Sequence, residues 1–262
     1  MLSYVLEIFG EHTLSPGEIL GLLSISLALI AGYGVHAAQI AFPVLQLGLF
    51  RIRTFSAAVG GSFFTRLGIG GVPFLLPLLY QVGLGFTPVQ SGLLIMPQAI
   101  AAMSTKFVMP KILERVGFRG VLVSNTIILG LLLMLFATVG IGTPLWLIVL
   151  QAFCYGAFTS LQYTSMNTLV YADIPDDKAS NASSIASTMQ QMSVSFGVAA
   201  AGLTTAFFIP ASSSSNSGEM IRGLHEAFLV LGGFTVLSTV IFSKLKSADG
   251  ENETRQKDLH LG

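Results

Sequence analysis

Long apolar stretches recur along this chain and are separated by short polar segments. A bilayer core is about 30 Å thick, so a helix needs about 20 apolar residues to cross it. No long apolar stretch alternates with a period of two, as the strands of a membrane barrel do. The pattern therefore predicts an all-α membrane protein of about seven transmembrane helices, at residues 19–41, 55–81, 89–109, 120–140, 144–169, 184–209 and 224–243.

The composition supports a membrane protein and excludes several other classes. Hydrophobic residues make up 52% of the chain and charged residues only 10%, whereas soluble domains carry about 25% charged residues. The net charge of zero provides no basic surface for nucleic acid. Lone Cys154 excludes an internal disulfide, and the chain carries no P-loop, nucleophile elbow or metal-ligand spacing. We therefore expect no enzyme and no cofactor or metal.

The distribution of basic residues predicts the orientation in the membrane. When the chain is threaded through the bilayer, eleven Lys and Arg residues fall on one side, and only Arg222 falls on the other. The positive-inside rule assigns the first side to the cytoplasm, with the C-terminus there and the N-terminus outside. An outside start with a short apolar segment at residues 2–9 suggests that the beginning of the chain is missing; a native short tail is the alternative.

Arg66 is the first candidate functional residue because it is a charge inside a predicted span. A mid-membrane charge is costly, so its side chain should face a cavity or a partner. It could contact substrate or protons in a pathway, or it could be a structural ion pair or an anchor to backbone carbonyls. No acidic residue lies in the middle of a predicted span, so a carboxylate partner has to come from a loop or another segment. The same span is rich in Gly and Pro, which is typical of broken transporter helices and also of static kinks.

Polar side chains interrupt the fifth and sixth predicted spans. They could line a cavity, with neighbouring Met residues as adaptable contacts for apolar ligands. They could instead form hydrogen bonds between helices, while Ser193, Gly197 and Ala201 form a seam of small residues. The candidate substrate-binding or pathway residues are Arg66, Gln162, Asn167, Thr188 and Gln191.

Several segments together resemble one transporter family. Residues 47–55, 77–97, 165–169 and 189–197 resemble parts of the C-terminal half of EmrB/QacA-type transporters. These are the 14-helix drug:proton antiporters of the major facilitator superfamily, and the resemblance is strongest to the MdtD-like branch. Residues 110–119 resemble the C-terminal copy of the superfamily's Asp-Arg-x-Gly-Arg loop, with Glu114 in place of Asp.

The resemblance implies a domain organisation. The seven spans correspond to helices eight to fourteen of the family. Residues 1–42 are then the end of a truncated helix plus one linker-type transmembrane helix. Residues 43–246 form a six-helix C-terminal transporter bundle, and residues 247–262 form a cytoplasmic polar tail. The expected location is a bacterial-type inner cell membrane, which the chain crosses several times.

The resemblance also implies a function. We expect proton-coupled efflux of lipophilic drugs or small molecules, with membrane lipid, lipophilic substrate and protons as partners, and no nucleic acid. In this family the proton-coupling acid belongs to the N-terminal half, so the chain should be inactive unless that half is supplied. The alternatives are a half-size carrier that acts as a homodimer, and a non-transporting membrane scaffold.

A gating role is the last expectation from the resemblance. The predicted gating loop consists of Glu114, Arg115, Gly117 and Arg119, in a short cytoplasmic turn between two spans. An acid held there near a helix N-terminus and a neighbouring Arg would favour one access state. The alternative is that the basic residues simply anchor the turn at the membrane surface.

Overall fold

The computed structural model describes residues 47–209, 217–246 and 249. Every regular element in these ranges is helical, which confirms the predicted all-α class. The predicted span at 19–41 and the predicted segment 1–42 lie outside the described residues. The longer helices are α3 (Arg53–Ile69), α4 (Val72–Leu78), α5 (Pro88–Leu135), α6 (Leu145–Tyr171), α7 (Ala179–Phe208) and α8 (Ser217–Leu237).

Shorter elements connect or extend these helices. A π-helical turn, η2 (Leu79–Gly83), continues α4, and the short helix α9 (Thr239–Phe242) extends α8. Three 3-10 turns complete the described elements: η1 (Leu47–Arg51), η3 (Phe136–Thr138) and η4 (Asp176–Lys178). Five helical segments among the described residues are long and apolar enough to cross a membrane.

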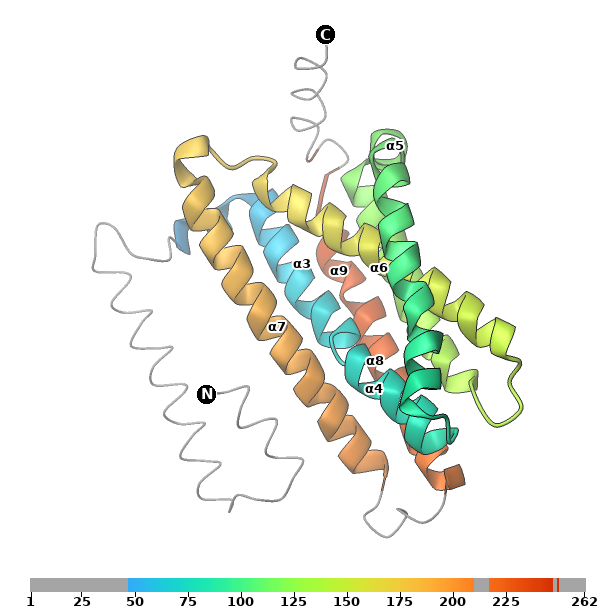
Figure 1. The fold of residues 1–262 in the computed structure, drawn as a ribbon. Coiled ribbons are helices and arrows are strands. Elements are labelled where there is room, and N and C mark those ends of the chain that lie inside the picture. Colours follow the sequence, from blue (N-terminus) through green and yellow to red (C-terminus); the bar gives the residue numbers. More distant parts are fainter. Residues whose placement is uncertain (1–46, 210–216, 247–248, 250–262) are drawn as a thin grey trace, which may run out of the picture.

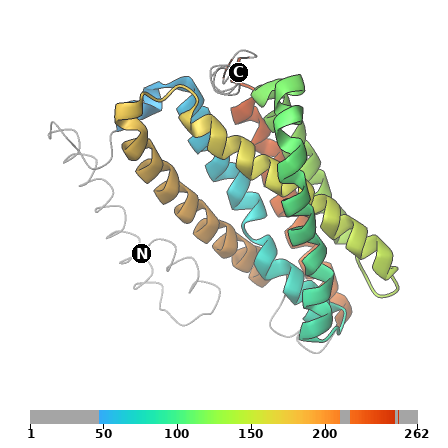
Figure 2. The same ribbon diagram turned by 45° about the horizontal axis from the view of Figure 1, so that its top comes forward.

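Six spans were predicted in this part of the chain, and α5 accounts for the difference. Helix α5 contains a non-helical residue, Gly117, with φ 73° and ψ 161°. Only glycine adopts this region readily, because it has no Cβ. The chain reverses here, and the two arms of α5, residues 88–116 and 118–135, run beside each other (Figures 1 and 2). The two arms are the two spans predicted at 89–109 and 120–140.

The helices form one bundle in which α8 is central. Helix α8 contacts α3, α5 and α7, and α6 packs mainly against α5. Helix α7 lies at the edge of the bundle, on α3 and α8 (Figure 1). The start of α3, the bend of α5, the α6–α7 connection and the end of α9 all lie at the same end of the bundle. That end carries the segments predicted to be cytoplasmic.

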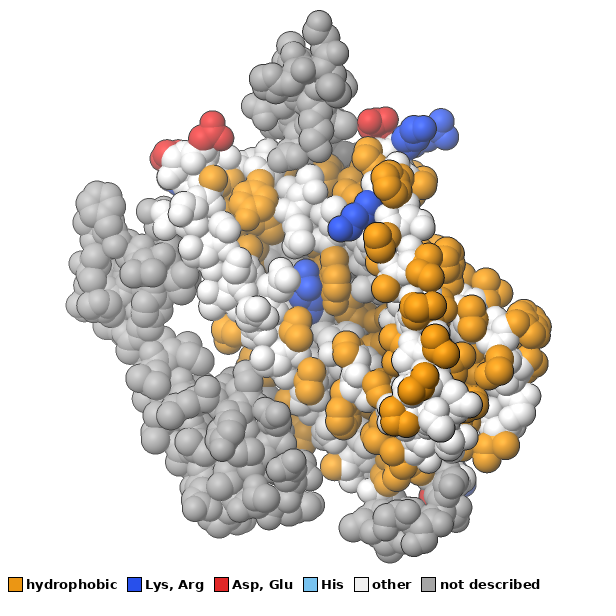
Figure 3. All heavy atoms as spheres, in the orientation of Figure 1, with side chains coloured by type: hydrophobic (Ala, Val, Ile, Leu, Met, Phe, Trp, Pro, Cys, Tyr) orange, Lys and Arg blue, Asp and Glu red, His pale blue; other side chains and the backbone are white. Residues whose placement is uncertain are grey.

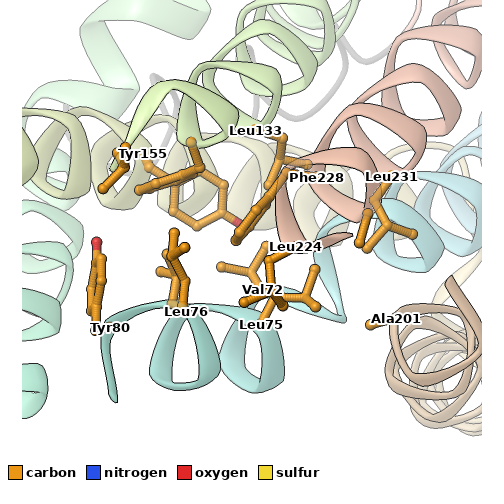
Figure 4. Close-up of a cluster of buried hydrophobic side chains, with 14 of the residues drawn as sticks. Val72, Leu75, Leu76, Tyr80, Leu133, Tyr155, Ala201, Leu224, Phe228 and Leu231 are labelled. Atoms are coloured by element: carbon orange, nitrogen blue, oxygen red, sulfur yellow. The ribbon is translucent and has the colours of Figure 1, made fainter. Parts of the chain in front are cut away.

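Two apolar clusters hold the two ends of the bundle together. In one of them, Leu75, Leu76 and Tyr80 from the α4 region pack against Leu133 of α5 and Phe228 of α8 (Figure 4). The other cluster surrounds the start of α3 and the end of α9. Since lipid is as apolar as these side chains, close packing rather than water exclusion holds such helices together.

The predicted seam of small residues is confirmed. Ser193, Gly197 and Ala201 are all buried on α7. A Cβ on Gly197 would lie 2.8 Å from the carbonyl oxygen of Arg66, which is closer than real Cβ contacts allow. The absence of a side chain at position 197 therefore sets how closely α7 approaches α3.

The chain beyond α9 packs onto the start of α3. Leu245 is only 2% exposed. Asp249 accepts hydrogen bonds from both the Nε and a terminal nitrogen of Arg53, and its Oδ2 also accepts from the Lys246 backbone N–H at 2.7 Å. Asp249 is the described part of the predicted tail at 247–262, and it is held against the bundle.

Candidate substrate pathway

Arg66 lies in the last turn of α3, where the helix breaks before α4. Its side chain is only 3% exposed. Its Nε donates a hydrogen bond to the hydroxyl of Ser62 at 2.9 Å, one turn earlier on α3. Its guanidinium carbon lies 3.9 Å from the ring centroid of Tyr163 on α6. A cation over an aromatic face is attracted by the ring's quadrupole, and burial strengthens that attraction.

No carboxylate accompanies this buried charge in the described part of the chain. The ion pair between Arg53 and Asp249 lies at the end of the bundle. The backbone-anchor alternative also finds no support, because the guanidinium forms no hydrogen bond to a backbone carbonyl among the described residues. Among the described residues, Arg66 is therefore held by the hydroxyl of Ser62 and by Tyr163. Glu226 lies within α8, and the other described acids lie near helix ends, at the bend of α5 or in connections: Glu114, Asp173, Asp176, Asp177, Glu219 and Asp249.

A cavity of about 600 Å³ lies between the first arm of α5 and α6, and we call it the α5–α6 cavity. This volume lies in the range of small-molecule pockets. Its wall is mainly apolar, with a few amide, hydroxyl and phenol groups. The lining residues are Gly92, Ile95, Met96, Gln98, Ala99, Ala102, Tyr155, Gly156, Thr159, Ser160, Tyr163 and Thr164.

Two of the cavity's polar groups differ in how their hydrogen bonds are satisfied. Ser160 donates to the carbonyl of Ala102 at 2.9 Å and so ties α6 to α5. The side-chain nitrogen of Gln98 is buried and has no hydrogen-bond partner among the described residues. A buried amide donor without a partner is costly, so a ligand that accepts from it gains affinity.

Tyr163 connects the cavity to the buried charge. The residue lines the α5–α6 cavity, and its ring carries the guanidinium of Arg66. A second cation, Lys106, lies one helical turn beyond Ala102 on α5 and is exposed. In Figure 3, acidic side chains gather at the upper edge of the bundle's face, whereas basic side chains also lie near its centre.

Gln162 lies on the other side of α6, facing the second arm of α5. It is fully buried, its Oε1 accepts from Asn125 at 2.7 Å, and its Nε2 donates to Thr126 at 2.7 Å. Asn125 also donates to the carbonyl of Phe158 at 2.9 Å. Of the two roles that the sequence left open for Gln162, interhelical hydrogen bonding describes this position, since Gln162 does not line the cavity.

Asn167 lies closer to Arg66. It is exposed and lines a small crevice together with Ser62, which is the hydrogen-bond partner of Arg66. Met189 and Gln190 of α7 complete that side of the crevice. The structure thus brings Arg66 and Asn167, two of the candidates from the sequence, to the same region between α3, α6 and α7.

Thr188 and Gln191 lie on the exposed face of α7, with Ser184 and Ser195. The hydroxyl of Thr188 donates to the carbonyl of Ser184 in its own helix at 2.8 Å. Neither Thr188 nor Gln191 bonds to another helix in the described part of the chain. Their polar face is therefore open to whatever packs against α7.

The predicted gating loop coincides with the bend of α5. Gly117 provides the reversal, while Glu114, Arg115 and Arg119 are exposed around it. These three charged side chains form no hydrogen bond or ion pair with other described residues. A gating contact at this loop would have to involve a group from outside the described residues.

Three residues that the structure places at this site are not among the candidates expected from the sequence. Ser62 and Gln98 carried a weak signal, because each is a polar residue inside an apolar span. Tyr163 lies in the polar run near the end of the fifth predicted span. Its role depends on α3 packing against α6, which nothing in the local sequence reveals.

Comparison with known proteins gives consistent matches. The family model of the Major Facilitator Superfamily matches residues 19–198 and 58–261. The chain is 33% identical over 264 residues to the putative multidrug resistance protein MdtD of Klebsiella pneumoniae subsp. pneumoniae, covering 100% of this chain and 56% of the relative. It is 34% identical over 239 residues to the protein of the same name from Escherichia coli O7:K1, covering 91% and 51%.

A third relative agrees with these two. The putative multidrug resistance protein MdtD of Pectobacterium atrosepticum is 34% identical over 247 residues, covering 94% of this chain and 51% of the relative. The chain thus spans about half the length of the curated relatives that it matches.

Proposed function

Since the chain belongs to the major facilitator superfamily, we propose that it supplies the C-terminal half of a proton-coupled exporter of lipophilic drugs or other small molecules. The membership confirms the resemblance inferred from the sequence motifs and makes the chain part of a membrane transport family. Drug export is suggested by the name of the relatives, putative multidrug resistance protein. Proton coupling rests on the resemblance alone.

The observation that carries the proposal is the α5–α6 cavity with a buried cation behind its wall. Transporter sites form near the bilayer midplane, beside broken helices whose halves move against each other. Arg66 lies directly before the break between α3 and α4, at Gly70 and Gly71. The lining is mainly apolar with a few polar groups, which suits lipophilic molecules.

The exposed faces of α7 and of the first arm of α5 support a second half as partner. Only 22% of the most apolar 18-residue stretch in the span that contains α7 is buried, the smallest share among the five spans. On the first arm, Met96, Ile100 and Met103 are all exposed beside the cavity. An N-terminal half packed there would close the cavity and supply the proton-coupling acid that the family resemblance assigns to that half. A second copy of the chain is the alternative occupant.

Drug accumulation in bacteria that lack their own efflux pumps tests the proposal. The chain is expressed alone and then together with the N-terminal half of one of its relatives, with ethidium as the fluorescent drug. We expect reduced accumulation only when both halves are present, and restored accumulation when a protonophore collapses the proton gradient. Reduced accumulation with the chain alone points to a homodimeric carrier.

A matched pair of variants separates transport from a scaffold role. Arg66→Ala removes the buried cation, whereas Arg222→Ala removes an exposed one in the first part of α8. We expect the first variant to abolish efflux at normal membrane levels and the second to leave it unchanged. If neither variant nor the N-terminal half changes accumulation, the chain is a non-transporting scaffold.

A further inference from the structure

The charge balance around the α5–α6 cavity is one-sided. Arg66 lies behind its wall and Lys106 lies one turn beyond its end, and every residue that lines it is neutral. The insertion of a charge at mid-membrane costs about 2.5–3.5 kcal/mol even on the lenient scales. An uncompensated cation therefore makes this region attractive for a negative group.

Arg66 has hydrogen-bonding capacity left for such a group. A guanidinium carries five N–H donors. Its contacts in the described residues are the bond from Nε to Ser62 and the interaction with Tyr163, which involves both the ring face and the phenol group. Donors on the terminal nitrogens therefore remain for a further acceptor, and guanidinium geometry matches carboxylate and phosphate groups.

The cavity wall disfavours cations. An aromatic ring attracts a cation through its negatively polarised face. The ring of Tyr163 is already in contact with the guanidinium of Arg66, and the charge of Arg66 repels a second cation. The unpaired donor of Gln98 also suits an acceptor rather than a cation. Met96 and Tyr155 provide apolar surface on which the body of a ligand can pack.

We propose that the α5–α6 cavity binds amphipathic organic anions, with the apolar body between α5 and α6 and the carboxylate, sulfonate or phosphate group directed toward Arg66. This substrate class rests on the proposed transport function, and it deepens that function. It predicts that the natural substrate carries an acidic group, and that cationic drugs of the same skeleton bind poorly.

Equilibrium binding to the full chain in nanodiscs of phosphatidylcholine tests this inference. The probes are pyrenebutyrate and its trimethylammonium analogue, which share one apolar body and differ in charge. Pyrene fluorescence anisotropy is measured against empty discs, so that only saturable binding to the protein is counted. We expect a dissociation constant about tenfold lower for the anion, because the charge of Arg66 behind the wall attracts the anion and repels the cation.

Three substitutions test whether the preference for the anionic probe depends on Arg66. Arg66→Gln should remove the preference, while Arg222→Gln, which removes an exposed cation elsewhere, should retain it. Gln98→Glu has nearly the same shape as the native residue and places a carboxylate in the wall, so it should weaken anion binding even if Arg66→Gln does not fold. Equal affinity for the two probes, or a preference that survives both Arg66→Gln and Gln98→Glu, overturns the inference.

Two further arms identify the anion and separate this inference from the proposed function. Discs with phosphatidylglycerol show whether an anionic lipid is the occupant, because the Arg66-dependent part of pyrenebutyrate binding then disappears. Anion binding by a chain that never supports efflux leaves the inference standing and removes the transport proposal. Efflux of cations by a chain that shows no preference for anions supports the transport proposal and overturns this inference.

Discussion

Gly117 shows how one residue decides the course of two helices. Its φ of 73° and ψ of 161° lie in a region that is closed to side chains with a Cβ. The residue belongs to a motif whose proposed role is gating, yet its backbone conformation is required simply for α5 to reverse. The local geometry therefore explains the glycine without any gating function, and the surrounding charges remain candidates for that function.

Gly117→Ala should destabilise the chain by about 1–3 kcal/mol, because alanine would be held in a strained conformation. Thermal unfolding in detergent, followed by size-exclusion chromatography, measures the loss as a lower midpoint. Gly92→Ala is the control, since a Cβ at that helical position meets no atom within 4 Å. An unchanged midpoint for Gly117→Ala would show that the bend can form in another way.

At the scale of the element, α7 depends on its seam of small residues more than on its apolar character. The helix is buried along a narrow stripe and leaves Thr188 and Gln191 on the opposite, exposed face. Gly197 allows the backbones of α7 and α3 to touch at Arg66. The same contact that attaches α7 to the bundle thus also supports the helix that carries the buried cation.

Gly197→Leu should force α7 away from α3 and lower the stability of the chain. A Cβ there would lie 2.8 Å from the Arg66 carbonyl oxygen and 2.9 Å from the Cα of Gly70, and backbone atoms cannot move aside cheaply. Gly202→Leu on the same helix is the control, because its Cβ would enter open space. Limited proteolysis of the α6–α7 connection compares the two; equal cleavage rates would contradict the expected loss of packing.

At the scale of the whole molecule, the two ends of the described chain meet. Arg53 begins α3, and Asp249 lies beyond α9, yet the two side chains form an ion pair. Burial raises the pKa of Asp249, but the hydrogen bonds from Arg53 and the Lys246 backbone, together with the charges of Arg53 and Lys246, lower it more, so the pKa lies below its usual value. The segment after α9 is thereby attached to the start of the bundle by an interaction that depends on pH.

Asp249→Asn should lower the thermal midpoint at neutral pH and have less effect in acid. Because the folded pKa of Asp249 is depressed, its stabilisation is fully present above the unfolded value of about 3.9 and is lost as the pH falls through the folded pKa. Unfolding midpoints are compared at neutral pH and below that value. Asp177→Asn, an exposed acid near the same end, serves as control, and a gap that persists in acid would refute the linkage.

The exposed polar face of α7 should matter for assembly and not for the fold of the chain. Changing Ser184, Thr188 and Gln191 together to Leu should leave the midpoint of the isolated chain unchanged, because these side chains are exposed. The same change should abolish the drug efflux that we expect with the N-terminal half. Ser124→Leu, an exposed polar position on the second arm of α5, is the control. Normal efflux by the triple variant would exclude this face from the pathway and the interface.

The sequence by itself determined the helices, because a backbone in lipid must satisfy its hydrogen bonds within each segment and needs about 20 apolar residues to cross. It also marked Arg66 as exceptional, the seam at Gly197 and the turn at Gly117. Only the tertiary structure decided that Gln162 pairs with Asn125 and that the Tyr163 ring carries Arg66. These contacts join residues far apart in the sequence, and the periodicity of one helix does not specify which neighbour its polar face will meet.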